Sequence, residues 1–257
     1  MVFAGREIPL LTLLLLFGIT LYLIRKGGPV PQIRRIAGLE AVDEAVGRAT
    51  EMGRAVFFTP GAGDVASSSS SVDTMAAIEI LSYVAKQCAR YKLSLTVGIK
   101  EPNTFAVADQ TVREAYIAAG EADAFNQSIV QFYSSAQWAY AASCVGFFKR
   151  ENPGAIFLFG FFQAEALMLA EGAAQSGAIT IGGMVRFNQL PTMVTACDYV
   201  LIAEELFVSG AYLSKNATKL SCVRAQDFGK IAALVLIMAG SLLATVGSKT
   251  LATIFSR

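Results

Sequence analysis

The sequence of 257 residues contains no histidine. Histidine is the usual general base of nucleophilic enzymes and the commonest metal ligand in proteins. Its absence excludes Ser-His-Asp and Cys-His catalysis, histidine-ligated metal centres and imidazole proton relays formed by this chain alone. Any chemistry of the protein must therefore use other side chains.

Cysteine is scarce. The four cysteines, Cys88, Cys144, Cys197 and Cys222, include no closely spaced pair. This spacing is typical neither of a zinc site nor of a disulfide framework. We expect these residues to act as small buried hydrophobic side chains in a reducing compartment, and we predict no metal and no cofactor.

An excess of positive charge is also missing from the middle of the chain. Residues 31–228 contain 15 Lys and Arg against 19 Asp and Glu, a net charge of 15 − 19 = −4. A surface that binds nucleic acid needs the opposite bias. We therefore predict no nucleic-acid partner.

Long apolar runs are present, and they lie near the two ends of the chain. Ile8–Ile24 and Ile231–Ser248 contain no charged residue, and Arg25 and Lys26 directly follow the first run. The first run has the minimum length for crossing a bilayer. A cleaved signal peptide is the alternative, but the basic residues follow the apolar core and no small-x-small cleavage site comes after it. We predict two transmembrane helices.

These runs predict the domain organisation: an anchor and linker at 1–30, an α/β domain at 31–228 and a transmembrane helix at 229–257. Basic residues are concentrated next to the middle domain, at Arg25, Lys26, Arg34, Arg35, Arg224 and Lys230, while Arg6, Lys249 and Arg257 lie at the two tips. The positive-inside rule then predicts a cytoplasmic middle domain in the inner (plasma) membrane, with both termini outside. The lipid bilayer is the first predicted partner.

Short apolar runs alternate with helical patterns through the middle of the chain. Continuous apolar runs predict strands at 55–59, 93–99, 155–162, 178–185 and 198–204, with a further strand at 129–134. Helical periodicity predicts helices at 38–53, 73–91, 105–120, 136–152 and 165–177, with Gly120 and Gly177 as C-terminal caps. This alternation predicts an α/β fold with a mostly parallel, doubly wound, Rossmann-like sheet.

Residues 155–170 have a second interpretation, because they are apolar enough to form a third transmembrane helix. Gln163 and Glu165 would then lie near the centre of the bilayer, where an ionised carboxylate costs about 2.5 to 3.5 kcal/mol. A strand followed by a helix avoids this cost. We favour the strand and helix.

A Gly/Ser-rich loop follows the first predicted strand, with the sequence TPGAGDVASSSSS at 59–71. Backbone amides in such a loop can bind a phosphate, and the candidate ligand-binding residues are Thr59, Gly61, Ala62, Gly63, Asp64, Ser67 and Ser68. The loop matches neither GxGxxG nor GxxxxGK[ST], and Asp64 would repel an anion. The other interpretation, which we favour, is a loop that ends the strand and caps the next helix through Ser71 or Asp73.

Further polar residues follow the other predicted strands, and the carboxyl edge of a doubly wound sheet is where ligands bind. They are Lys100–Asn103, Gln163 with Glu165, Arg186 with Asn188 and Gln189, and Glu204 with Glu205. Glu204 and Glu205 have the chemistry for acid–base catalysis or Mg²⁺ binding. Adjacent carboxylates at a strand-to-helix junction more often stabilise the start of the helix, and we predict that role.

Two sets of residues suggest contacts between subunits or helices. Small residues let membrane helices approach closely, and Gly240, Ser241, Ala244 and Gly247 lie together in the second apolar run. Aromatic residues are abundant between Tyr133 and Phe162, and core packing accounts for most of them. We expect the remaining aromatic side chains to cover a subunit interface.

Residues 34–61, RRIAGLEAVDEAVGRATEMGRAVFFTPG, resemble a family of bacterial and archaeal membrane-anchored proteins of unknown function. Members of that family begin with a single anchor, followed by a helix and strand that end in the same TPG. The resemblance implies a prokaryotic origin and a membrane anchor. It implies no activity and no catalytic residue.

These observations predict a membrane-anchored structural or assembly subunit that is not an enzyme. Its cytoplasmic domain would form a homo-oligomer or dock a membrane protein complex, because confinement to a membrane raises effective concentration. The alternative is a membrane-tethered module that senses or transforms a nucleotide or another phosphate at the strand ends. A transporter component is a third possibility, and it would need residues 155–170 to span the membrane.

Overall fold

The computed structural model describes residues 14, 15, 18, 22, 35–214 and 217–245. The chain divides into two compact units, one of Arg34–Ser214 and the other of Met1–Ile33 with Lys215–Arg257. We call Arg34–Ser214 the α/β domain. It ends before residue 228, the boundary predicted from the sequence, because the long helix of the second unit already begins at Ala217.

Six parallel strands form the sheet of the α/β domain. They are β1 (Val56–Gly61), β2 (Leu95–Ile99), β3 (Val130–Phe132), β4 (Ala155–Phe161), β5 (Ile179–Met184) and β6 (Tyr199–Ile202). Their order across the sheet is β3-β2-β1-β4-β5-β6, and every neighbouring pair is parallel. All six predicted strands and the parallel sheet are confirmed. Continuous apolar sequence marks them because helices cover both faces.

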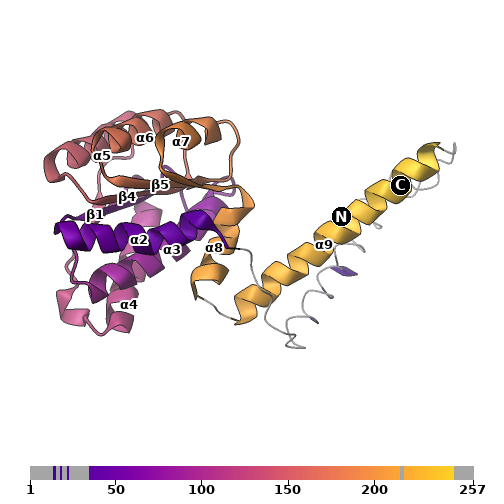
Figure 1. Ribbon diagram of the computed structural model, residues 1–257, viewed down its shortest axis with the longest axis horizontal. Coiled ribbons are helices and arrows are strands. Elements are labelled where there is room, and N and C mark those ends of the chain that lie inside the picture. The colour runs from indigo at the N-terminus through magenta and orange to yellow at the C-terminus, as the bar shows by residue number, and fades with distance from the viewer. Residues whose placement is uncertain (1–13, 16–17, 19–21, 23–34, 215–216, 246–257) are drawn as a thin grey trace. The chain divides into compact units, whose positions relative to one another are not determined.

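Helices lie on both faces of the sheet, as Figure 1 shows. One layer contains α2 (Ala37–Met52), α3 (Ser71–Arg90), α4 (Pro102–Ala119) and α8 (Glu204–Ser214), and the other contains α5 (Gln137–Glu151), α6 (Glu165–Gln175) and α7 (Leu190–Ala196). A short 3₁₀ helix, η1 (Ala122–Ala124), precedes β3. This is the predicted doubly wound arrangement.

The five helices predicted for the domain are confirmed. The helix α7 was not predicted, and α8 was expected only as a helix start at Glu204 and Glu205. Gly120 and Gly177 have the left-handed backbone expected after α4 and α6. Residues 155–170 form β4, which is completely buried, and the start of α6. The interpretation of this segment as a third transmembrane helix is therefore wrong.

Aromatic side chains fill the core next to β1 and β4. The rings of Phe57 and Phe148 meet edge to face with centroids 5.0 Å apart, and the rings of Phe157 and Phe159 stack at 6.1 Å. All four side chains are buried. The prediction that most aromatic residues serve core packing is confirmed, but Trp138 is an exception with 58% of its surface exposed.

The cysteines of the α/β domain are free thiols. Cys88 and Cys144 are buried, and Cys197 is half-buried. Burial raises the pKa of the Cys88 thiol to about 12. The expectation of small buried side chains is confirmed for Cys88 and Cys144.

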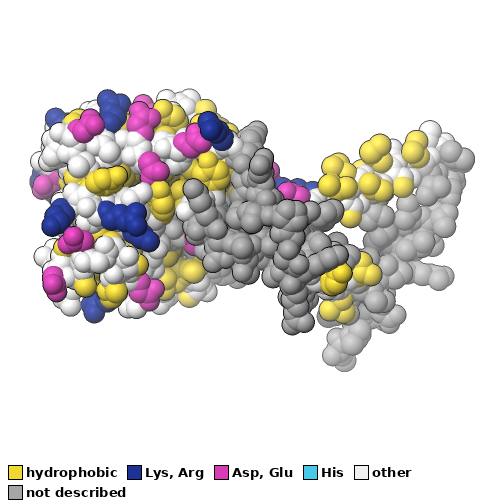
Figure 2. All heavy atoms as spheres, turned by 60° about the horizontal axis from the view of Figure 1, so that its bottom comes forward, with side chains coloured by type: hydrophobic (Ala, Val, Ile, Leu, Met, Phe, Trp, Pro, Cys, Tyr) yellow, Lys and Arg dark blue, Asp and Glu magenta, His cyan; other side chains and the backbone are white. Residues whose placement is uncertain are grey.

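The second unit contains α9 (Ala217–Thr245), the helix that includes most of the second apolar run. Figure 2 shows hydrophobic side chains along its described part, and Ile231, Leu234, Val235, Ile237, Met238 and Leu242 are each 56 to 67% exposed. Of the predicted helix-contact residues, Gly240, Ser241 and Ala244 lie in α9, and Gly247 lies outside the described residues. Most of Ile8–Ile24 also lies outside them.

Transmembrane helices were predicted at both apolar runs. Among the residues that the structure describes, no helix combines the length and the apolar character required to cross a membrane.

Candidate functional site

The candidate site lies where the connections leaving two adjacent strands go to opposite faces of the sheet. The chain passes from β1 to α3 in one helix layer, and from neighbouring β4 to α6 in the other. Doubly wound sheets bind ligands at this switch point, outside the carboxyl ends of the strands. The Gly/Ser loop at 61–70 therefore occupies the position that the sequence suggested for a ligand site.

The two central strands are irregular at this point. Their register shifts between Thr59 and Gly61, and Gly61 and Gly160 have φ angles of +78° and +111°. A Cβ on Gly61 would lie 2.1 Å from the carbonyl oxygen of Phe161, and one on Gly160 would lie 2.5 Å from that of Pro60. Such bulges are common next to active sites. Gly61 and Gly160 are required because the backbones of β1 and β4 lie too close together for a side chain.

Most backbone amides of the loop donate hydrogen bonds within the protein. Three amides donate to residues outside their own turn: Ala62 N to Phe161 O (2.8 Å), Asp64 N to Ser70 Oγ (3.1 Å) and Val65 N to Thr104 Oγ1 (3.2 Å). Three more donate within the loop: Ala66 N to Asp64 Oδ1 (2.9 Å), Ser67 N to Asp64 O (3.1 Å) and Ser71 N to Ser67 O (2.9 Å). A phosphate cradle needs amides that converge on the ligand. A phosphate bound here would have to replace several of these bonds.

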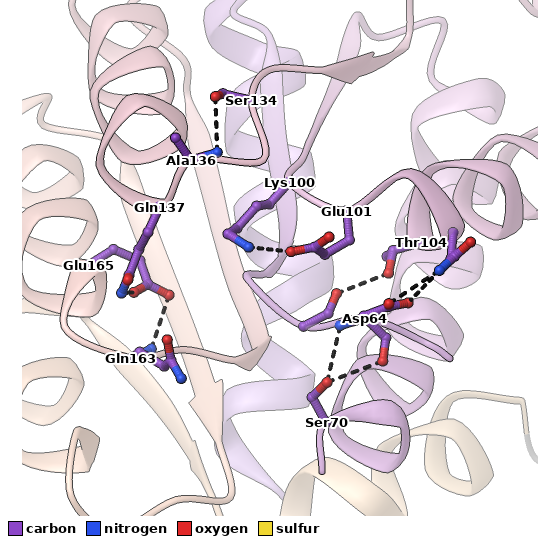
Figure 3. Close-up of polar contacts among 12 residues, drawn as sticks. Asp64, Ser70, Lys100, Glu101, Thr104, Ser134, Ala136, Gln137, Gln163 and Glu165 are labelled. Carbon is purple, nitrogen blue, oxygen red and sulfur yellow. Dashed lines mark hydrogen bonds and ion pairs between the residues drawn. The ribbon is translucent and has the colours of Figure 1, made fainter. Parts of the chain in front are cut away.

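The start of α4 holds the loop from one side, as Figure 3 shows. The hydroxyl of buried Thr104 donates to Gly63 O at 2.9 Å and accepts from Val65 N at 3.2 Å. Asn103 Nδ2 lies 3.2 and 3.3 Å from the two carboxylate oxygens of Asp64. The carboxylate of Asp64 therefore points to the amide of Asn103.

Arg186, which follows β5, holds the other end of the loop. Its Nη2 donates to Ser69 O at 2.7 Å, and its guanidinium lies 4.5 Å from the centre of the Phe161 ring. Its Nε is 4.0 Å from Asp73 Oδ2. Burial raises the pKa of Asp73, and the positive charge of Arg186 opposes that rise.

The predicted cap of α3 is wrong. Ser71 is the first helical residue, and the N-cap residue Ser70 makes no side-chain capping bond. The Ser70 hydroxyl instead donates to Asp64 O at 3.1 Å, while Asp73 faces Arg186. Ser70 therefore binds the loop, and Asp73 faces Arg186 from the first turn of α3.

The seven predicted ligand-binding residues are differently placed. Gly61, Ala62 and Gly63 are buried, and Thr59 is fully buried, where its hydroxyl bonds the Tyr140 hydroxyl and accepts from Gly61 N at 3.1 Å. Asp64 and Ser67 are half-buried, and Ser68 is exposed. A ligand at the surface of the loop would meet these last three.

A buried carboxylate lies on the other side of the switch point. Glu165, the first residue of α6, is fully buried and accepts hydrogen bonds from Gln137 Nε2 and from Gln163 N, the latter at 3.0 Å. The positive end of the helix dipole stabilises it there. Gln137 could not be recognised from the sequence, because no local pattern shows that its side chain contacts Glu165 in another helix.

Tyr140 of α5 is a second buried residue with a polar group at this point. Burial is the main cause of its pKa lying well above the usual value for tyrosine. Its hydroxyl therefore stays protonated and bonded to Thr59. It stabilises the core below the bulge.

Three of the remaining strand-end residues, Lys100, Glu101 and Glu205, have partners nearby. Lys100 forms an ion pair with Glu101, and only 14% of its side chain is exposed. Glu204 and Glu205 begin α8, and Glu205 Oε2 accepts a hydrogen bond from Ile202 N at 3.2 Å, which agrees with the predicted role at a helix start. In the described part of the chain, no group of three or more Cys, Asp or Glu side chains is arranged to hold a metal ion.

The chain belongs to the family defined by a domain of unknown function, DUF6754, whose family model matches residues 2–255. This agrees with the predicted membership of an uncharacterised family. No curated protein and no solved structure matches the chain significantly.

Proposed function

We propose that the protein is a membrane-anchored assembly subunit. In this proposal, the apolar runs Ile8–Ile24 and Ile231–Ser248 cross the inner membrane, and the cytoplasmic α/β domain packs against copies of itself or a partner complex. The observation that carries the proposal is that the chain enters and leaves the α/β domain at one corner.

Contacts between the first and last helices define this corner. Tyr212 OH donates to Glu40 Oε1 at 3.3 Å, which joins the end of α8 to the start of α2. The start of α2 also lies against β6, since a Cβ on Gly38 would be 2.7 Å from Leu201 Cδ2. Residues 25–35 then lead back to the first apolar run, and α9 leads forward to the second.

Two anchors that leave one corner can enter the same patch of membrane without straining the domain. Residues 25–35 reach at most about 35 to 40 Å when extended. Within α9, the exposed apolar side chains between Ile231 and Leu242 form a surface that lipid would cover. Tethering at both ends confines the domain near the bilayer, where weak lateral contacts between copies become effective.

Extraction with alkaline carbonate tests the anchoring. We expect the full chain to stay in the membrane pellet. It should also stay there when only one apolar run is altered, either by replacing Leu14 and Leu15 with arginine or by replacing Leu234 and Ile237 with arginine. Replacing all four should release it, because each buried arginine costs about 2.5 to 3.5 kcal/mol. Ile117→Arg adds a charge to an exposed site of the α/β domain and serves as the control. Release of the unmodified chain would overturn the anchoring.

The mass of the particle in mild detergent tests the assembly. We expect a regular particle whose protein mass is a multiple of 27.3 kDa, or a defined complex with a second protein. Confinement to a membrane favours such complexes at low concentration. A monodisperse single chain at all concentrations would contradict the assembly role.

The second candidate is a phosphate-sensing module, and the observation that favours it is the position of loop 61–70 at the switch point of the sheet. Asp64, Ser67 and Ser68 are the predicted residues that a ligand could reach from solvent. A thermal shift with a panel of nucleotides and inorganic phosphate tests it. A shift that Ser68→Asp removes would support this function, and no shift with any compound would contradict it.

A further inference from the structure

Exposed apolar side chains are concentrated at one edge of the α/β domain. Nine large ones lie at the last residue of a strand, in a strand-to-helix connection or in the first two turns of the next helix: Val72 (63% exposed), Met75 (44%), Phe132 (45%), Trp138 (58%), Leu167 (55%), Phe187 (72%), Val194 (53%), Ile202 (44%) and Phe207 (38%). All six strands are parallel, so these positions share the carboxyl edge of the sheet. We call these nine residues the carboxyl-edge set.

The core does not use these side chains. Other aromatic residues form the buried core, among them Phe57, Phe157 and Phe159. Single exposed hydrophobic residues are common on soluble domains, but a concentrated group indicates a surface that is covered in the working protein. Four of the nine residues of the carboxyl-edge set are aromatic, and such residues are favoured where protein meets the lipid headgroup region.

Most ionised groups at this edge are matched locally. Lys100 pairs with Glu101, Arg186 lies 4.0 Å from Asp73, and the amide of Asn103 contacts Asp64. No basic cluster stands among the carboxyl-edge set in the described residues. The carboxyl-edge set itself contains no lysine or arginine, the residues that select anionic lipids, and its apolar side chains fit a neutral headgroup interface.

The corner where the chain enters and leaves the domain lies on the same edge. Gly38, the second residue of α2, packs on Leu201, the penultimate residue of β6. Tyr212, near the end of α8, contacts Glu40 in the first turn of α2. The segments that lead to both apolar runs thus begin beside the carboxyl end of the sheet.

We infer that the carboxyl-edge set rests on the lipid headgroup interface, so that the α/β domain lies with this edge against the bilayer. The inference rests on the proposed anchoring of the protein, and it leaves the other faces of the domain open for assembly. The lipid surface would cover the carboxyl-edge set. A protein that covers the same residues would be a different outcome.

Trp138 reports on this contact directly, because it is the only tryptophan of the chain and belongs to the carboxyl-edge set. The experiment places the full chain in phosphatidylcholine vesicles, with or without bromine atoms on the acyl chains near the headgroup. Bromine quenches indole fluorescence only at short range. We expect a loss of about half or more of the Trp138 emission in brominated vesicles, as for an interfacial tryptophan.

Substitutions at exposed sites provide matched variants. Leu167→Ser and Phe187→Ser remove apolar surface at the carboxyl edge and should reduce the quenching at least about twofold. Tyr91→Ser and Ile117→Ser change side chains of similar exposure (54 and 59%) at the C-terminal ends of α3 and α4 and should leave it unchanged. Equal effects of both pairs would contradict the inference.

The outcomes separate this inference from the proposed function. If carbonate retains the chain in the membrane but Trp138 is not quenched, the inference is wrong and the anchoring stands. If carbonate releases the chain, the anchoring itself is wrong. If Trp138 is shielded from aqueous acrylamide without bromine quenching, a protein surface covers the edge and lipid does not.

Discussion

The carbonyl oxygen of Phe161 lies where the side chain of residue 61 would begin. A Cβ on Gly61 would be only 2.1 Å from this oxygen, which also accepts the hydrogen bond from Ala62 N at 2.8 Å. Gly61 also has a φ of +78°, which residues other than glycine rarely adopt. This contact fixes the bulge between β1 and β4 and the start of the loop at the switch point.

Gly61→Ala should therefore destabilise the α/β domain by about 3 kcal/mol or more, through the left-handed backbone and the clash together. Gly53→Ala is the matched control. Gly53 has a φ of +63°, but a Cβ added to it would meet no atom within 4 Å, so the change should cost only about 1 kcal/mol. Chemical denaturation of the two variants measures both values. Equal losses would show that the Phe161 contact is unimportant.

Thr104→Val should destabilise the domain by about 1 to 3 kcal/mol. The hydroxyl of Thr104 serves Gly63 O and Val65 N in a buried position, and valine leaves both groups without their partner. Thr111→Val is the control, because the Thr111 hydroxyl only contacts Val107 O in its own helix. Its cost should stay within about 0.5 kcal/mol. Hydrogen exchange of the Val65 amide should rise only in the Thr104 variant.

Alkaline pH should destabilise the domain in part through Cys88. Its thiol has a usual pKa of 9.0, and burial raises the pKa to about 12 in the folded protein. Between these values the unfolded chain loses the proton and the folded chain keeps it, so stability falls as pH rises, by about 1.4 kcal/mol per pH unit. Below pH 9 this contribution is constant.

Urea denaturation from pH 8 to 10.5 of the native protein and of Cys88→Ala measures this effect. The variant loses some packing at all pH values, but its stability should fall less steeply above pH 9. Tyr83, whose pKa is also about 12, contributes to both curves equally. Parallel curves for the two proteins would contradict the raised pKa of Cys88.

The strands could be predicted because burial on both faces leaves a continuous apolar sequence, as in β4 (Ala155–Phe161). The helix α7 was missed because it has only seven residues, and only the start of α8 was expected, at Glu204 and Glu205. Short helices depend on packing partners, and α8 depends on its contacts with α3. Such partners are not visible in a local pattern.

The position of the candidate site could also be predicted, but not its internal bonds. The sequence shows that glycines and serines follow β1. It does not show that Thr104 and Arg186, from distant segments, hold the loop and engage its polar groups. The capping prediction failed for the same reason, since Asp73 faces Arg186.

Cysteine labelling in intact cells tests the anchoring and orientation most directly. A chain without its native cysteines would carry a single new one at Ala4, Ser68 or Ser256, and a membrane-impermeant maleimide would be added from outside. Ser68 lies in the exposed part of the loop in the α/β domain, and the other two lie near the termini.

If both termini lie outside, as we propose, the cysteines at positions 4 and 256 should be labelled in intact cells. The cysteine at 68 should be labelled only after the membrane is opened. Labelling of position 68 in intact cells, or protection of both termini, would contradict a cytoplasmic α/β domain held by a transmembrane helix at each end.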